Sequence, residues 1–265
     1  MLLAMVPSAT SDIECDTVMP GEPLEILHLD DHCVAINKPP GLLVHRTSVD
    51  RSATRFAMQM LRDQLGRLVY PTHRLDKATS GVLVFGLNSE SARAITEQFA
   101  ARTTQKTYVA LVRGFTAAEG RLDARLKDMA DAKSESRLQQ KEREAVTEFR
   151  TTARFELPIP DERHPTSRYS LVEIAPKTGR RHQIRRHLKH ASHPIVGDTT
   201  HGDHRHNKRW RLHFGLSRML LAATRLELAH PVSSEPMVIE AAVGSEFSTA
   251  LESISSHRAA LFSDP

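Results

Sequence analysis

The apolar residues of this chain fall into short runs separated by turn-forming residues, a pattern typical of strands in a sheet. Two such runs, 24–29 and 33–37, flank Asp30-Asp31-His32 and predict a β-hairpin. Further strand-like runs occupy 82–85, 107–112, 146–155, 169–175, 220–228 and 237–242. Because strands outnumber helices and short turns join many of them, we predict an α+β fold with a central mixed or antiparallel sheet flanked by helices and loops.

Helical spacing of apolar residues occurs in fewer places. Helices are predicted over 52–64, 89–101, 177–191 and 245–255. Ser52 and Ser89 stand where side chains that cap a helix N-terminus are favoured. Pro194 follows the third segment and cannot continue it, because proline lacks the backbone donor. These helices are expected to cover the sheet.

The domain organisation follows from where periodicity is lost. Residues 1–22 show no sustained pattern and predict a flexible N-terminal extension. Residues 23–265 are then expected to form a single domain, with a charged surface insertion near 116–145.

Composition places the chain among globular proteins. Of 265 residues, 40% are hydrophobic and 26% are charged, which is too apolar for wholesale disorder. No run approaches the roughly 20 apolar residues of a membrane-spanning helix, and the apolar start lacks the basic leader of a signal peptide. Cys15 and Cys33 are isolated, which suits a reducing cytosol. We therefore expect a cytoplasmic protein with no membrane contact, and a monomer as the default.

The positive charge is concentrated in one segment. Residues 177–211 hold ten Lys and Arg against two Asp, a balance of +8, whereas the whole chain carries only +4. Seven histidines lie in the same segment. A solvated charged face is the ordinary interpretation of such a run. Basic residues on both faces of the helix predicted here favour a polyanion such as RNA as partner.

Common nucleotide-binding and metal-binding motifs are missing. The chain contains no GxxxxGK[ST], GxGxxG or GxSxG. Two groups of residues resemble metal clusters at first sight: His201, Asp203, His204 and His206, and His187, His190 and His193. Neither matches HExxH or a cysteine-rich zinc pattern, so we predict no metal site.

The segment 73–81, HRLDKATSG, is the strongest candidate for chemistry. It is polar, contains the carboxylate of Asp76, and precedes an apolar strand that could hold it rigidly. Asp76 could equally cap a turn by accepting hydrogen bonds from Thr79 or nearby amides. Tyr108 could be an amphipathic core residue, and Arg185 a phosphate contact or a surface charge. The residues alone leave these alternatives open.

Taken in order, five motifs resemble the RluA family of RNA pseudouridine synthases. They are NKPPGLLVH at 37–45, HRLD at 73–76 with TSG at 79–81, KTY at 106–108, PKTGRRHQIR at 176–185 and HPIVGD at 193–198. The resemblance covers about residues 24–242 and implies the pseudouridine synthase catalytic fold. It also implies an isomerase that converts uridine to pseudouridine without metal, nucleotide or organic cofactor.

The resemblance assigns roles to individual residues. Asp76 matches the family's catalytic aspartate, which acts as a nucleophile at ribose C1′ or as a base at C2′. Tyr108 matches the tyrosine that stacks on the target base, and Arg185 the basic residue that pairs with the aspartate. Arg74 matches the arginine that fills the space left by the flipped nucleotide, with His73 as a further RNA contact.

The basic residues around Arg185 are expected to hold the RNA backbone; they are Arg180, Arg181, Arg186 and Lys189. The chain departs from the family at Leu221-Ala222-Ala223, where relatives commonly have Leu-His-Ala. That departure leaves the role of the missing histidine in doubt.

Several phrases, among them Val44-His45-Arg46, Tyr169–Glu173 and His201-Gly202-Asp203, are most similar to a branch of the family that acts on tRNA at position 65. We therefore expect tRNA as the partner. A ribosomal RNA substrate, a non-catalytic RNA-binding protein and a hydrolase with a carboxylate nucleophile are the alternatives.

Overall fold

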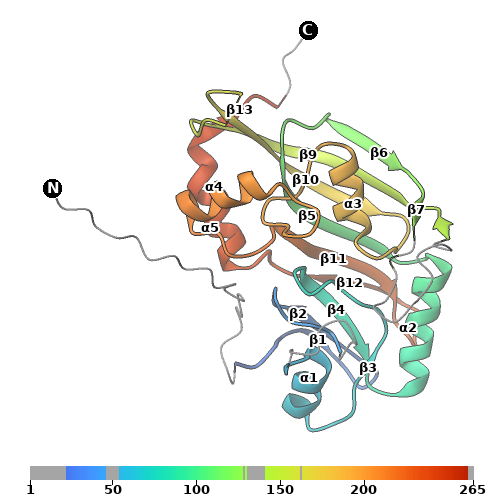
Figure 1. Cartoon of the computed structure of the whole chain (residues 1–265). Helices are drawn as coiled ribbons and strands as arrows, with labels where there is room; N and C mark the ends of the chain where they lie inside the picture. The colour runs from blue at the N-terminus through green and yellow to red at the C-terminus, as the bar shows by residue number, and fades with distance from the viewer. Residues whose placement is uncertain (1–21, 46–53, 128, 130–140, 162, 262–265) are drawn as a thin grey trace.

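A large mixed sheet forms the centre of the molecule (Figure 1). The computed structural model describes residues 22–45, 54–127, 129, 141–161 and 163–261. Along the sheet the order is β1 (Glu25–Leu29), β2 (Cys33–Lys38), β4 (Ser80–Gly86), β11 (Leu221–Ala229), β5 (Gln105–Arg113), β10 (Ser167–Pro176), β9 (Val146–Leu157) and β13 (Arg258–Ala259). Shorter strands pair at its sides: β12 (Pro236–Glu240) with β11, β3 (Tyr70–Pro71) with β4, and β6 (Glu119–Asp123) with β9. A separate pair joins β7 (Leu126–Lys127) to β8 (Glu142–Arg143).

Two halves of the sheet meet where β4 runs parallel to β11. The other pairs in this sheet are antiparallel, so the predicted α+β class with a mixed sheet is confirmed. In this parallel pair Ser80 lies opposite Ala222 and Gly81 opposite Ala223. Gly81 has φ +110°, and a Cβ there would collide with the backbone carbonyl of Ala223. Only glycine fits this close approach, which fixes the loop before β4 at the middle of the sheet.

The helices cover both faces of the sheet. They are α1 (Ala57–Leu65), α2 (Ser89–Ala101), α3 (Gln183–His190), α4 (His204–Phe214) and α5 (Ser245–Ile254), followed by a 3₁₀ turn at Ser255–His257. Alternating residues of a strand point to opposite faces, so Val34 packs in the cluster of α1 and Ala35 in that of α2. In the other half, Ala110 shares a core with α3 and Leu111 with α4 and α5. Among the described helices none has the length and apolar composition needed to cross a membrane.

Two predicted helix starts and one predicted cap differ from the structure. α1 begins at Ala57, after Phe56 bridges to Leu43; the proposed cap, Ser52, lies outside the described residues. α2 is capped by Asn88, whose side chain accepts from the Ser91 amide at 2.8 Å, and Ser89 is already helical. The third helix begins at Gln183 rather than Lys177, because residues 177–182 form a turn.

Helix α4 is not predicted by the apolar pattern. Eight of its eleven residues, HRHNKRWRLHF, are polar or charged, and its buried residues are His206 and Trp210. Asp203 caps it by accepting from the amides of Arg205 and His206. The predicted insertion near 116–145 contains β6, which extends the sheet beside β9, whereas 128 and 130–140 lie outside the described residues. The division into an extension and one domain stays a prediction.

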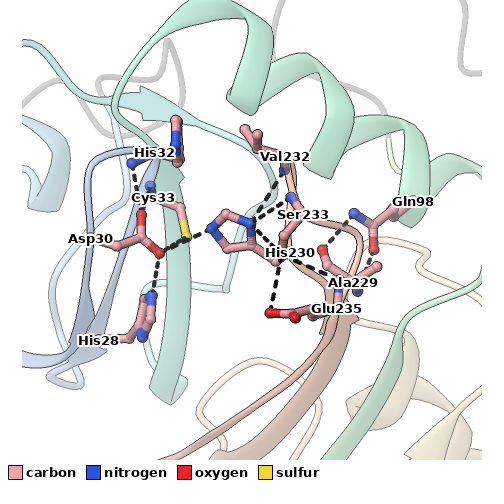
Figure 2. A network of polar contacts seen from close by, with 10 residues as sticks. All are labelled: His28, Asp30, His32, Cys33, Gln98, Ala229, His230, Val232, Ser233 and Glu235. Carbon is pink, nitrogen blue, oxygen red and sulfur yellow. Dashed lines mark hydrogen bonds and ion pairs between the residues drawn. The ribbon is translucent and has the colours of Figure 1, made fainter.

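A polar network fastens the first hairpin to the turn between β11 and β12 (Figure 2). The Oδ2 atom of Asp30 accepts from Nε2 of His28 at 2.7 Å and lies 3.2 Å from Nε2 of His230. The Oδ1 atom accepts from the amides of His32 and Cys33 at 2.7 and 2.8 Å. One carboxylate therefore orders the hairpin turn and reaches a segment 200 residues away.

The proton positions in this network follow from its backbone donors. Backbone amides can only donate, so Nδ1 of His230 accepts from Val232 and Ser233, and its ring proton lies on Nε2, facing Asp30. His28, Asp30 and Cys33 bring ligand-type atoms within 4.8 Å of one another. Burial, followed by the charge of Asp30, raises the pKa of the Cys33 thiol to about 12. In this structure hydrogen bonds join the three residues: His28 and the Cys33 thiol both donate to Oδ2 of Asp30.

We predict that Asp30→Asn destabilises the protein by about 1–2 kcal/mol at pH 7. Burial alone would raise the pKa of Asp30, but the hydrogen bonds from His28 and the amides of Cys33 and His32 lower it below its ordinary value of 3.8. The stabilisation is therefore present above about pH 4 and is lost as the pH falls further. Urea unfolding of both proteins from pH 7 to pH 2 measures the difference. The exposed neighbour substitution Asp31→Asn should leave stability within about 0.5 kcal/mol, and a wild-type–Asp30→Asn difference independent of pH would contradict the ionic role.

Candidate active site

Asp76 lines a cavity of about 630 Å³. It stands in the loop between β3 and β4, where the Thr79 amide donates to the backbone carbonyl of Asp76 at 3.0 Å. The main chain therefore makes the turn, and the side chain is left for the cavity. That side chain is 19% exposed, and Tyr108 and Arg185 line the same cavity. The structure brings the three predicted active-site residues together.

A buried lysine ties this loop to the first motif. Lys38, at the end of β2, donates from Nζ to the carbonyls of Pro39 and Leu42 at 2.7 and 2.8 Å, and to that of Lys77 at 3.2 Å. The Gly41 amide also donates to the Lys77 carbonyl, at 2.9 Å. Burial, together with the charge of Arg218, lowers the pKa of Lys38 to about 7. The segment after β2 thus clamps the residue next to Asp76.

Gln183 fixes the turn from which Arg185 extends. Its buried Oε1 accepts from Thr178 Oγ1 at 2.6 Å and from the Arg180 amide at 3.0 Å. Its Nε2 donates to the carbonyl of Val146 at 2.9 Å and to Thr147 Oγ1 at 3.0 Å. These bonds fasten the start of α3 to β9, and the next turn of the helix packs Ile184 and Leu188 on the sheet. Arg185 is thereby aimed into the cavity.

Arg185 is held between two carboxylates. Its Nε and Nη2 each lie 2.8 Å from an oxygen of Asp198, and its Nη1 lies 3.2 Å from Oδ2 of Asp76. The side chain is only 6% exposed, so the interpretation as a surface charge is wrong. Burial by itself would lower the pKa of Arg185, but the bonds to Asp198 and Asp76 raise it. The same guanidinium lowers the pKa of Asp198 against the opposing effect of burial.

Tyr108 lines the same cavity as the Asp76 carboxylate. It lies on β5, between Ile174 of β10 and Ala223 of β11, and is half-buried. Burial, followed by the charge of Asp76, raises the pKa of the Tyr108 phenol. The phenol is therefore protonated at neutral pH, and its ring offers an apolar stacking face.

His73 and Arg74 occupy different environments although they are adjacent. Nε2 of His73 accepts from the Val84 amide at 3.1 Å, and its ring stacks on Phe99 at 4.3 Å between centroids. Burial lowers the pKa of His73 to about 3, so the ring is neutral. Arg74 is exposed, and both residues line the cavity. Their roles toward RNA stay predictions.

Basic side chains surround the mouth of the cavity. Arg180 and Arg181, two of the predicted RNA-backbone contacts, line it together with Arg102 and Lys106, which no sequence motif indicated. Of the other predicted backbone contacts, Arg186 donates to the Lys127 carbonyl at 2.9 Å and Lys189 is exposed on α3. With Asp76 as the acidic residue within it, the cavity suits a polyanion whose reacting part is neutral.

The two histidine groups that resemble metal clusters in the sequence are dispersed in the described fold. His206 bonds to the Tyr169 hydroxyl at 2.9 Å, His187 to Thr147 Oγ1 at 2.9 Å and His193 to the Arg113 carbonyl at 2.9 Å. His201 alone approaches the cavity, through a contact with His182. Sequence reasoning gave no catalytic role to Asp198, His182 or His201. Asp198 and His182 stand inside the motifs of the resemblance, and that position was the signal that could have identified them.

Comparisons with known proteins show the family of the chain. The family model described as RNA pseudouridylate synthase matches residues 32–190, more than half of the chain. The tRNA pseudouridine synthase C of Vibrio vulnificus is 49% identical over 222 residues, covering 83% of this chain and 91% of that protein. The protein of the same name from Pectobacterium carotovorum is 48% identical over 220 residues, which cover 82% of this chain and 58% of that protein.

Solved structures show the same fold. Human RNA Pseudouridylate Synthase Domain Containing 4 superposes with a TM-score of 0.66 at 25% identity, covering 87% of this chain and 93% of that one. Human RNA Pseudouridylate Synthase Domain Containing 1 gives a TM-score of 0.65 at 24% identity, covering 85% and 86%. The motifs, the fold and these relatives agree, and the chain belongs to the RluA family of RNA pseudouridylate synthases.

Proposed function

We propose that this protein isomerises uridine to pseudouridine in tRNA, at position 65, with Asp76 as the catalytic residue. The observation that carries the proposal is the geometry of Asp76: one oxygen is bound by the buried Arg185, and the carboxylate faces a cavity that Tyr108 also lines. The charge-assisted hydrogen bond fixes the orientation of the carboxylate. The reaction requires a carboxylate held in a defined position beside the ribose.

The reaction breaks the bond between N1 of uracil and C1′ of ribose and joins C5 to C1′. Asp76 can add to C1′ as a nucleophile or remove the C2′ proton as a base, and both routes need the same ionised group. Tyr108 offers a flat face on which the uracil can stack while it is detached. Arg185 keeps the carboxylate oriented throughout.

Several observations support tRNA as the substrate. The relatives reported above are named for tRNA and match over most of this chain. The basic rim of Arg74, Arg102, Arg180 and Arg181 suits the phosphates that flank an extruded nucleotide. Position 65 and chemistry without a metal or nucleotide cofactor are finer parts of the proposal that rest on the resemblance to the family. The cytoplasmic location rests on the isolated cysteines, and a monomer is the default.

We predict that the purified protein forms pseudouridine in tRNA taken from a strain that lacks this gene. Mapping of new pseudouridines should place the product at position 65. Asp76→Asn should abolish turnover, a loss of at least about 10⁴-fold, and should leave tRNA affinity within about threefold, because the amide keeps the shape but cannot act as nucleophile or base.

Each other outcome has a distinct meaning. Product on ribosomal RNA alone would overturn the tRNA assignment and keep the enzyme class. Uracil released into solution would identify a hydrolase. Turnover that survives in Asp76→Asn would remove Asp76 from the chemistry.

A separate prediction concerns extrusion of the uridine from its helix. Extrusion costs a few kcal/mol in unstacking and unpairing, and Arg74 is expected to fill the vacated space. Arg74→Ala should lower the single-turnover rate about tenfold or more on folded tRNA, and less than about threefold on an oligonucleotide with an unpaired target. Arg93→Ala, on the exposed side of α2, serves as the charge-matched control and should leave both rates unchanged. Equal losses on the two substrates would argue against the filling role of Arg74.

A further inference from the structure

A pair of histidines adjoins the free oxygen of Asp76. Nε2 of His182 lies 3.9 Å from Oδ1 of Asp76, whereas Arg185 holds Oδ2. On the other side of its ring, Nδ1 of His182 lies 2.9 Å from Nε2 of His201. The 3.9 Å distance exceeds a hydrogen bond. His182 therefore has its hydrogen-bond partner in His201, and its Nε2 edge faces the space beside the reacting carboxylate.

The backbone at His182 is shaped to direct this ring. His182 has φ +53°, a left-handed conformation that side chains other than glycine adopt rarely and at a cost of about 1–2 kcal/mol. The hydrogen bonds of Gln183 hold the turn in place. The ring that results lines the cavity together with Tyr108 and is 16% exposed. Uncommon backbone conformations that the surroundings enforce cluster at functional sites.

Asp198 aligns both partners of Asp76. Its carboxylate binds the Arg185 guanidinium, and its Oδ1 also accepts from the amides of Thr200 and His201 at 2.9 Å each. One buried carboxylate thus positions the guanidinium on one side of Asp76 and, through the turn at His201, the imidazole pair on the other. His201 is half-buried, so the pair leads from the cavity toward solvent.

The surroundings keep His182 neutral and therefore able to accept a proton. Burial lowers the pKa of His182 to about 4; the charge of Asp76 opposes this, and the charges of Arg185, His201 and Arg181 reinforce it. Burial likewise lowers the pKa of His201. Tyr108 is held as a neutral phenol, which makes it a poor base. Among the described histidines that line the cavity, His73 uses Nε2 to accept from the Val84 amide, whereas Nε2 of His182 lies 3.9 Å from Asp76.

Pseudouridine formation requires a proton acceptor for C5 of uracil as well as a group that acts on ribose. Once C5 of uracil is bonded to C1′, C5 is tetrahedral and still carries its hydrogen. We propose that His182, positioned by His201, is the base that removes this hydrogen; the proposal rests on the function proposed above and deepens it.

The step is balanced in atoms and electrons. The C5–H bond breaks, and its proton passes to Nε2 of His182. The electron pair of that bond forms the C5=C6 double bond, and the pair of the C6=N1 bond returns to N1, which takes up a proton. The proton on Nδ1 of His182 then passes to Nε2 of His201, which gives up its own Nδ1 proton to solvent. After the product leaves, exchange with water removes the proton from Nε2 of His182 and returns one to Nδ1, and His201 exchanges likewise, which restores the starting base.

His182→Gly is the sharpest variant to test this step. Glycine adopts positive φ without strain, so the variant removes the ring and leaves the turn intact. Its single-turnover rate on tRNA should fall about 10²-fold or more, as expected for loss of a general base. Deuterium at C5 of uridine should slow this variant further, because C5–H cleavage now limits the rate. Added imidazole should restore the rate in proportion to its unprotonated fraction.

The controls separate this inference from the proposed function. His190→Gln, an exposed histidine on the same helix, should keep the wild-type rate. His201→Gln should lie between the wild type and His182→Gly, and a wild-type rate there would overturn the relay. Three results would each overturn the assignment of His182: a wild-type rate in His182→Gly, the same rate in that variant with and without deuterium at C5, or no increase in its rate on addition of imidazole. Wild-type protein that forms no pseudouridine in tRNA would instead overturn the proposed function.

Discussion

The site depends on one buried guanidinium placed between two carboxylates. Arg185 binds Asp198 through two nitrogens and Asp76 through a third, in surroundings where its side chain is only 6% exposed. Breaking such a pair by removal of one partner leaves an uncompensated buried charge, at a cost of about 3–5 kcal/mol. The loop before β4 must therefore dock on a segment more than 100 positions later, which holds both the start of α3 and the turn that carries Asp198.

This constraint also explains how the charge of the chain is divided. The basic segment 177–211 looks uniform in the sequence, yet the fold separates its members by task. Arg185 enters the interior to hold a carboxylate, Arg180 and Arg181 line the cavity, and Arg205, Lys208 and Arg211 are exposed on α4. An interior with paired charges suits chemistry on a neutral base, whereas a basic rim suits the phosphates around it.

The sequence predicts the strands and the main site residues better than it predicts what positions them. Strand periodicity and the resemblance to a family locate Asp76, Tyr108 and Arg185, because motifs record which residues react. The contact between Arg185 and Asp76 spans 109 positions, and no spacing rule connects such residues. The apolar pattern does not predict helix α4 because few of its positions are buried. The side chain of Gln183, rather than helix propensity, determines where α3 starts.

The most direct measurement of this account is the single-turnover rate of Asp198→Asn, alone and combined with Asp76→Asn. Asp198 touches no reacting atom, so its effect must pass through Arg185 and the turn of His201. The account predicts that Asp198→Asn slows pseudouridine formation about 10²-fold with tRNA affinity nearly unchanged, and that the double variant is no slower than Asp76→Asn alone. A folded Asp198→Asn protein that works at the wild-type rate would contradict it.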